Sequence, residues 1–427
     1  MRRLALLFVL ACLAAPAAAA AQSSDYCDPA RTEYDPQDLA RPNAPPIELP
    51  PGYRRGRLAF GPYSTPTIEA GPSDSDEAVV LIHGNPGNSY DFLGLLRSIP
   101  AGTRVLALDL VGFGRAEKPW DFPYTIELTT PMLEGALHDR GVRRVHLVAH
   151  DVGSVVGIDW AAAHPGELAS AVIFAGGILI GYQDHHFARI WKTPGLGEEF
   201  MRGGDREGFV NFIQAHNPRP LPREFLDRNY DVYDRPTRCA ILTAYRNEGD
   251  VSAKAERHAA ALRPHDRPAL VIWGDRDPFV PVYVANSNRE GFPHADVHVY
   301  ENSGHWPFVD EEERTVRLMR DFFGKHVVEQ AGARIRLAVT PRHPRLGRRT
   351  RFRVRVVVGE ARRPLAGALV RVLGRRARSD AGGRAVVVAT PRRAGLVRTA
   401  ASKETLARGR KTIRVLRRGG TRRATAR

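Results

Sequence analysis

Six short apolar runs recur along residues 78–300, and the stretches between them are long enough to hold helices. The runs cover residues 78–82, 105–108, 145–149, 171–174, 269–273 and 297–300. Apolar runs without polar alternation are typical of strands that are buried on both faces of a parallel sheet, and the intervening lengths suit crossover helices. The sequence therefore predicts an α/β fold with a mostly parallel, doubly wound sheet.

The spacing of these runs is regular except between residues 174 and 269. The insertion contains aromatic residues among charged helix formers, namely Trp191, Phe200, Phe209, Phe212, Phe225, Tyr230, Tyr233 and Tyr245. A segment of this length inside a sheet domain is too long for an ordinary loop. We therefore expect a helical cap over about residues 180–262.

The chain begins with the features of an export signal. Two arginines precede an apolar core at residues 4–13 and a small-residue stretch at 14–21, and these are the three zones of a secretory signal peptide. We expect residues 1–21 to be removed and the protein to be secreted or held in the cell envelope. Residues 22–56 contain seven prolines, which favour an extended arm because proline cannot donate to a helix or a strand ladder.

Cysteine usage limits the chemistry of the mature chain. With three cysteines in all, one of them in the leader, the chain cannot build a disulfide framework or a four-thiolate metal site. Cys27 and Cys239 either pair in an oxidising compartment or remain separate thiols. His185 and His186 have no third residue at metal-ligand spacing, so we expect them on the surface of the cap. We expect neither a metal nor another cofactor.

The last quarter of the chain has a different composition and a different periodicity. Residues 331–427 hold 29 Lys+Arg and three acidic residues, a net charge of +26, whereas the rest of the chain carries −10. Apolar residues alternate with arginine over 351–356 and 369–372, as in half-exposed antiparallel strands. We expect a C-terminal all-β sandwich at 328–416 and a disordered basic tail at 417–427.

A strand-to-helix turn follows the third apolar run. Residues 149–153 read Ala-His-Asp-Val-Gly and lead directly into a helix-like segment at 154–163. Small residues on both sides of a sharp turn allow one side chain to be raised above the sheet without a clash. Here that side chain is Asp151, which we interpret as a nucleophile. A carboxylate can displace a leaving group at a saturated carbon and form an alkyl-enzyme ester.

An acid and a histidine follow in the chain order that this turn requires. Asp275 and Asp277 come after the fifth run, and His305 comes after the last run. We choose Asp277 as the acid, because a residue two positions beyond the strand exit can turn back toward the histidine. Asp277 would then hold the tautomer of His305, and His305 would activate water to attack the Asp151 ester.

A glycine-containing turn follows the first run. Residues 83–87 read His-Gly-Asn-Pro-Gly, and the glycines allow the backbone to approach the nucleophile closely. The backbone amides of Asn85 and Val152 are therefore our candidates for binding the developing oxyanion.

With these motifs in place, residues 57–327 resemble the catalytic domain of the α/β-hydrolase superfamily. The resemblance is to its aspartate-nucleophile branch, which comprises epoxide hydrolases and haloalkane dehalogenases, and it implies an α/β-hydrolase fold. The segments that carry it are His-Gly-Asn-Pro at 83–86, Asp-Leu-Val-Gly-Phe-Gly at 109–114, His-Asp-Val-Gly-Ser at 150–154, Tyr-Arg-Asn at 245–247 and Gly-His-Trp at 304–306.

The two branches differ in how they hold the leaving group. Haloalkane dehalogenases place a tryptophan directly after the nucleophile to bind the halide, whereas this chain has Val152, which lacks a side-chain donor. Asn85 could still bind a halide. Tyr245 matches the tyrosine that polarises the epoxide in the hydrolases, and the resemblance implies that it acts as the acid.

Two further residues are expected to border the pocket. Epoxide hydrolases have a second cap tyrosine, and Phe187 lies near its place while Tyr182 lies five residues away. We expect Phe187 and Trp306 to form part of the pocket wall.

These observations lead to two classes of function. The first is a secreted hydrolase of small, mostly apolar electrophiles, with epoxides favoured over haloalkanes and esters. The second is a non-catalytic surface or binding protein built on a retired hydrolase domain. The C-terminal segment resembles bacterial Ig-like and carboxypeptidase-regulatory-like modules, and its charge predicts attraction to an anionic envelope polymer or lipid surface. Nucleic acid is not an expected partner of an exported protein.

Overall fold

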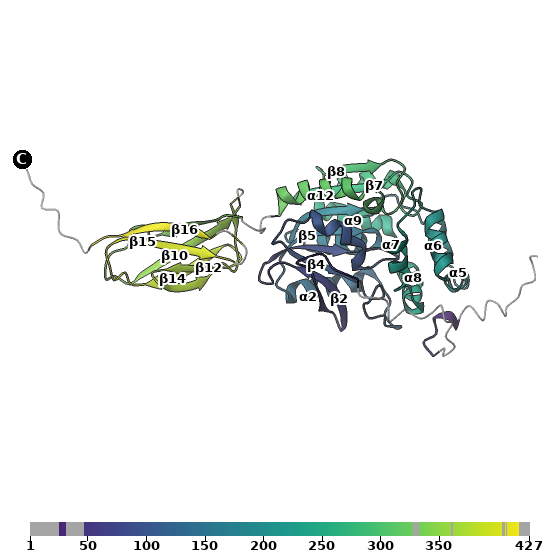
Figure 1. Cartoon of the computed structure of the whole chain (residues 1–427), viewed down its shortest axis with the longest axis horizontal. Coiled ribbons are helices and arrows are strands. Elements are labelled where there is room, and N and C mark those ends of the chain that lie inside the picture. The colour runs from purple at the N-terminus through teal and green to yellow at the C-terminus, as the bar shows by residue number, and fades with distance from the viewer. Residues whose placement is uncertain are drawn as a thin grey trace, which may run out of the picture.

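The computed structural model describes residues 25–30, 47–327, 333–359, 362–403, 406 and 408–417. The predicted signal peptide, much of the predicted arm and the basic tail beyond residue 417 lie outside these residues. Figure 1 shows a larger α/β unit and a smaller β unit. Within the described part of the chain, no helix is long and apolar enough to cross a membrane.

An eight-stranded mixed sheet forms the centre of the larger unit, in the order β1-β2-β4-β3-β5-β6-β7-β8. The strands are β1 (Arg54–Phe60), β2 (Tyr63–Ala70), β3 (Glu77–Ile82), β4 (Arg104–Leu108), β5 (Arg144–His150), β6 (Leu168–Phe174), β7 (Ala269–Gly274) and β8 (Asp296–Tyr300). The strands from β3 to β8 pair in parallel, which confirms the predicted fold class.

Strands β1 and β2 add an antiparallel edge to this sheet. β1 begins at Arg54, within the segment that the sequence predicts as an extended arm. The sequence signal is weak here because β1 is half exposed and carries three arginines, so that it has no continuous apolar run.

Helices cover both faces of the sheet. The chain moves across the sheet in one direction from β3 to β4 through η3 (Ser89–Ser98), and in the opposite direction from β4 to β6 through α2 (Ile126–Asp139) and α3 (Asp151–Ala163). Right-handed crossovers therefore place η3 on one face and α2 with α3 on the other. After β8, α11 (Pro307–Asp310) leads into α12 (Glu312–His326), which packs beside η3.

The cap follows β6 and consists of five helices. They are α4 (His186–Lys192), α5 (Leu196–Arg202), α6 (Arg206–Ala215), α7 (Arg223–Tyr230) and α8 (Arg235–Asn247). The predicted cap extended to residue 262, but α9 (Val251–Leu262) packs against α3 and α10 (Asn288–Gly291) and so belongs to the layer that covers the sheet. Its buried residues face that layer. Helical periodicity predicts that α9 has an apolar face, but it does not predict whether that face packs against the cap or against the sheet.

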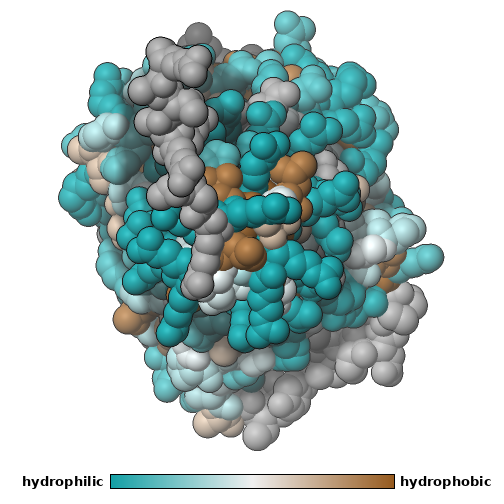
Figure 2. Space-filling view, turned by 90° about the vertical axis from the view of Figure 1, so that its left-hand side faces the viewer, coloured by the Kyte–Doolittle hydropathy of each residue, from teal (hydrophilic) through white to brown (hydrophobic). Residues whose placement is uncertain are grey.

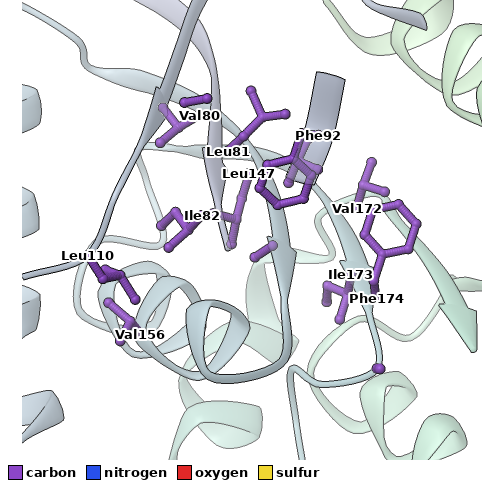
Figure 3. Packing of buried hydrophobic residues seen from close by; sticks show 14 of the residues in the cluster. Val80, Leu81, Ile82, Phe92, Leu110, Leu147, Val156, Val172, Ile173 and Phe174 are labelled. Atoms are coloured by element: carbon purple, nitrogen blue, oxygen red, sulfur yellow. The ribbon is translucent and has the colours of Figure 1, made fainter. Parts of the chain in front are cut away.

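The core of the larger unit lies between the sheet and its helices (Figure 3). Strands β3, β5 and β6 contribute Val80, Leu81, Ile82, Leu147, Val172, Ile173 and Phe174, and the flanking helices contribute Phe92 and Val156. These side chains are almost wholly inaccessible to solvent, and together they hold the ends of β3 and β5 in place for the site described below.

A disulfide joins Cys27 to Cys239 of α8, with their Cα atoms 5.6 Å apart. Of the two alternatives for these cysteines, the structure therefore has the pair. The neighbouring Tyr26 is buried against the cap, and the guanidinium of Arg235 donates to its carbonyl oxygen. The segment that precedes the sheet is thus attached to the cap.

The smaller unit contains two antiparallel sheets that enclose a core of their own. The first sheet contains β9 (Ile335–Thr340), β10 (Thr350–Val358), β11 (Arg363–Pro364) and β14 (Arg384–Ala389), and the second contains β12 (Leu369–Val372), β13 (Arg375–Arg378), β15 (Gly395–Ser402) and β16 (Gly409–Val415). Buried and exposed residues alternate along β10 and β14. The C-terminal region is therefore an all-β module, as the alternation predicted.

Candidate active site

Asp151 is the first residue of α3 and follows β5 directly. Its φ of +48° lies in the left-handed region, which non-glycine residues rarely adopt. The neighbouring turns require small residues, because a Cβ on Gly153 would lie 2.1 Å from the carbonyl oxygen of His83 and one on Gly84 would lie 2.5 Å from the Cβ of Asp151. The sharp turn places this carboxylate at the carboxyl end of the central strands.

Two backbone amides hold the Asp151 carboxylate. The Asn85 N–H donates to its Oδ1 at 2.8 Å, and the N–H of Val152 donates to the same side chain. Burial raises the pKa of Asp151, whereas the charge of His305 and the two amides act in the opposite direction, and the net shift is upward. The two amides predicted from the sequence thus face the predicted nucleophile.

His305 lies between two carboxylates. Its Nδ1 is 2.8 Å from Oδ2 of Asp277, and its Nε2 is 3.6 Å from Oδ2 of Asp151. The backbone amides of Phe279 and Val280 both donate to Oδ1 of Asp277 at 2.9 Å, which fixes the orientation of that carboxylate. This is the arrangement of a nucleophile, a base and an acid that orients the base.

The structure brings Asp277, and not Asp275, to the histidine. Asp275 is exposed and accepts from the backbone N–H of Ser303. Burial lowers the pKa of His305, but the charge and the hydrogen bond of Asp277, together with the charge of Asp151, outweigh burial and raise it. The imidazole is therefore a stronger base than an isolated histidine.

A cavity of about 520 Å³ opens above Asp151, between the sheet and the cap. Asn85, Asp151 and His305 line it on the sheet side. Its walls come mainly from apolar side chains of the cap and neighbouring loops, namely Ile190, Trp191, Leu196, Phe200, Met201, Phe209, Phe212, Ile213, Phe279 and Trp306. Such a cavity favours apolar substrates.

Of the predicted pocket residues, Tyr245 and Trp306 line this cavity and Phe187 does not. The ring of Phe187 instead packs among the rings of Phe200, Phe212 and His216 in the interior of the cap. Its direction is set by how α4 docks on the neighbouring cap helices, which the sequence does not reveal.

His185 is a cavity residue that sequence reasoning placed wrongly on the cap surface. It is 8% exposed and precedes α4, where its Nδ1 accepts from the N–H of Ala188. Burial, reinforced by the charge of His305, lowers the pKa of His185 to about 4. The ring is therefore neutral at pH 7, and because Nδ1 is an acceptor its proton resides on Nε2. His186 is exposed, as expected.

Two tyrosines lie near the nucleophile. Burial and then the charge of Asp151 raise the pKa of Tyr245 well above its usual value, and a hydrogen bond with the Asn85 side chain acts against this shift. Burial, followed by the charges of Glu248 and Asp151, raises the pKa of Tyr182. Sequence comparison placed Phe187 nearer than Tyr182 to the expected position of the second cap tyrosine, but of the two it is the tyrosine whose pKa is raised by the charge of Asp151.

Comparisons with known proteins show the family to which this fold belongs. The model of the alpha/beta hydrolase fold family matches residues 77–312, which are more than half of the chain. The 2-hydroxy-6-oxononadienedioate/2-hydroxy-6-oxononatrienedioate hydrolase of Paraburkholderia phymatum is 25% identical over 269 residues, covering 58% of this chain and 88% of that protein.

Solved structures show the same fold. The haloalkane dehalogenase DatA from Agrobacterium tumefaciens C58 has a TM-score of 0.56 at 23% identity and covers 64% of this chain and 97% of its own. The 2-hydroxy-6-oxo-6-phenylhexa-2,4-dienoate hydrolase from Rhodococcus sp. strain RHA1 has a TM-score of 0.54 at 19% identity and covers 64% and 99%. This chain is an enzyme that belongs to the α/β-hydrolase fold family.

Proposed function

We propose that the protein is an exported epoxide hydrolase that uses Asp151 as a covalent nucleophile. The observation that carries the proposal is the pair of donors, Tyr245 and His185, that line the same cavity as Asp151 and His305. Their ring centroids are 6.2 Å apart. When an epoxide opens, its oxygen stays attached to the product, and two donors in the same cavity as the nucleophile suit that oxygen.

The first step forms an ester and opens the ring. Oδ2 of Asp151 attacks a ring carbon, and the bond from that carbon to the epoxide oxygen breaks. The raised pKa of Tyr245 keeps its hydroxyl protonated at neutral pH, so that it can donate to the departing oxygen. The Nε2–H of the neutral His185 serves as the second donor.

The second step hydrolyses the ester. Nε2 of His305 takes a proton from water, and the oxygen of that water attacks the carbonyl carbon of the Asp151 ester. The negative charge that develops on Oδ1 is stabilised by the amides of Asn85 and Val152. The bond from this carbon to the product oxygen then breaks, and the protonated His305 returns its proton to that oxygen, which releases a diol. The second proton of the water restores the hydroxyl of Tyr245 and leaves Asp151 as a carboxylate.

Haloalkane hydrolysis is the second candidate, because solved haloalkane dehalogenases share the fold and Asn85 borders the nucleophile. A halide needs donors that are free to bind it. Val152 has no side-chain donor, so the side-chain amide of Asn85 is one donor where haloalkane dehalogenases are expected to have two. These features favour the epoxide.

Export is supported by the disulfide. Disulfides persist in oxidising compartments such as the periplasm or the cell exterior, and are rare in reducing cytosol. The pairing of Cys27 with Cys239 therefore agrees with the predicted signal peptide.

A single turnover in heavy-oxygen water tests the nucleophile. We expect the label to enter the carboxylate of Asp151, because water attacks the carbonyl carbon of the ester and the diol receives the original oxygen of Asp151. Mass spectrometry of the peptide that contains Asp151 measures this. Label in the diol alone would rule out covalent catalysis.

Substrate preference is tested with Tyr245→Phe and His185→Asn, the latter retaining an N-cap acceptor for α4. Each variant should slow epoxide opening by roughly 10²-fold, the scale of a lost general acid, and leave haloalkane turnover nearly unchanged. Tyr233→Phe is a matched control, because Tyr233 also lines the cavity but its hydroxyl bonds to the sulfur of Met201. Equal losses on both substrates would assign the two residues to cap packing.

A further inference from the structure

One end of the all-β module gathers several loops, and we refer to it as the distal end. It contains the loop at 341–349, the loop at 390–394 with the first two residues of the strand β15 that follows it, and the segment at 415–417. Backbone hydrogen bonds join these segments, from Leu346 N–H to the oxygen of Leu416 at 2.8 Å and from Gly347 N–H to the oxygen of Pro391 at 2.9 Å. The end is therefore one continuous surface.

The distal end is opposite to the point where the chain enters the module. β9 begins at Ile335 and runs to Thr340, where the first distal loop starts. A partner bound at the distal end would thus lie at the far side of the module from its connection to the hydrolase unit, and Figure 1 shows the module extending away from that unit.

Leucine side chains are exposed on this surface. Leu396, at the start of β15, is 68% exposed, and Leu416, just after β16, is 44% exposed. Figure 2 faces this end of the molecule and shows hydrophobic residues near the middle of a mostly hydrophilic surface. The strand face of β14 also exposes Val386 and Val388, at 43% and 42%, but Leu396 is the most exposed large apolar side chain of the described module. A contact at the distal end would bury it.

Arginines surround the leucines. The two distal loops expose Arg342, Arg345, Arg348, Arg349, Arg392 and Arg393. Neither loop contains an acidic residue, and among the described residues none of these arginines forms an ion pair. The sequence has four further arginines between residues 418 and 427, which lie outside the described residues. The charge is therefore available to an external anion.

We propose that the distal end docks on an anionic lipid bilayer. Leucines that enter the interface gain from burial, and surrounding arginines bind the anionic head groups, which is how peripheral proteins attach to membranes. A soluble polyanion would need the arginines but not the exposed leucines. Docking in this way holds the hydrolase beside the apolar interior of the bilayer, into which apolar electrophiles partition.

Flotation of the full mature protein with vesicles tests this proposal. The vesicles contain phosphatidylcholine with or without phosphatidylglycerol. We expect binding to the anionic vesicles that weakens with salt, because exposed charges are screened over about 8 Å at physiological ionic strength. Equal binding to both vesicle types, or to neither, would overturn the proposal.

Paired variants separate the contributions of the leucines and the arginines. Leu396→Ser with Leu416→Ser should weaken vesicle binding by about tenfold or more at constant charge. Arg392→Gln with Arg393→Gln should weaken it by roughly fivefold for each arginine. The matched control is Arg371→Gln with Arg376→Gln, two exposed arginines that pair across β12 and β13 on the side of the module.

The control decides which surface binds. We expect the Arg371 and Arg376 variant to bind almost as the native protein does. If it loses as much binding as the distal variant, the net charge of the module is sufficient and the distal end is not the docking surface. If the leucine variant binds normally while the arginine variants weaken, the surface recognises charge alone, as on a soluble polyanion, and the membrane proposal is wrong. Circular dichroism confirms that each variant is folded.

Discussion

The two units of this protein use their arginines in opposite ways. In the hydrolase unit, arginines join neighbouring elements: Arg246 of α8 pairs with Glu198 of α5 at 2.7 Å, and Arg206 of α6 pairs with Asp227 of α7 at 2.9 Å. In the described part of the β module, arginines project from the strand faces and form no such pairs. Charge therefore stabilises the architecture of the first unit, whereas in the second it is free to act on a partner.

The units also differ in where polar groups are buried. Asp151, Asp277 and His305 are buried together in the hydrolase unit, at a cost that hydrogen bonds and mutual attraction offset. In the described part of the β module, the buried residues are apolar apart from Ser379, Thr399 and Lys403. We therefore expect the chemistry to depend on the first unit and retention at a surface to depend on the second, and the following predictions test that division.

The largest effect is expected at His305. His305→Gln should trap the alkyl-enzyme, because ring opening does not need this base while ester hydrolysis does, and turnover should fall by something on the order of 10⁴. Mass spectrometry of the Asp151 peptide should show the added substrate mass. His186→Gln, at an exposed position on the cap, serves as the control. Unchanged turnover in the His305 variant would remove this histidine from the mechanism.

The pH dependence should follow the shifted pKa of His305. The base acts in its neutral form, so turnover should rise with pH through a pKa above the ordinary value of 6.5. Asp277→Asn removes the main group that raises this pKa and leaves burial, which lowers it, opposed by the charge of Asp151 alone. The rising limb should then move to lower pH, alongside a loss of rate. A pH profile of ester hydrolysis measures this, and a limb that stays in place would show that Asp277 does not act on the base.

The disulfide should stabilise one unit alone, because both cysteines lie in the hydrolase unit. Cys27→Ser with Cys239→Ser should reduce the stability of that unit by about 2–4 kcal/mol, or roughly 5–10 °C in its melting temperature. Scanning calorimetry should show no shift in the transition of the β module. A shift in both transitions would mean that the units unfold together.

The smallest effect on chemistry is expected from removing the β module. Truncation after Val327 should leave turnover of a small soluble substrate almost unchanged, because the two hydrophobic cores are separate. Vesicle binding should be lost at the same time. Unfolding of the truncated hydrolase would contradict the division, and would show that contacts such as that between Lys403 and Asp76 are essential to it.

Much of the fold could be predicted because burial leaves a local pattern. Strands that are covered on both faces are apolar at most positions, and this pattern located β3 to β7. The partly exposed edge strand β8 was located from the shorter run at residues 297–300. β1 is half exposed, and β2 is mostly buried but carries Thr65, Thr67 and Glu69, so neither strand has a continuous apolar run and both were missed. The predicted cap extended too far along the chain, to residue 262, for a related reason. The sequence of the amphipathic helix α9 does not indicate whether its apolar face packs against the cap or against the layer that covers the sheet.

The residues of the candidate site also fall into two groups, those that the sequence could predict and those that it could not. Asp151, Asp277, His305 and Asn85 each follow a strand, and the carboxyl ends of neighbouring parallel strands converge on one edge of the sheet, so chain order was enough to group them. His185 and Phe187 belong to the cap, whose helices are not aligned by a shared sheet. Their positions depend on how the cap packs, and both were assigned to the wrong surroundings.

The sequence by itself determined the α/β class, the turn that raises Asp151 and the change to an alternating basic module, because each is encoded within a few neighbouring residues. Tertiary structure decided that Cys27 meets Cys239, that a neutral His185 joins Tyr245 in the cavity, and that leucines and arginines share the distal end. These features join residues that are far apart in the chain, and only the packing of helices and strands fixes the distances between them.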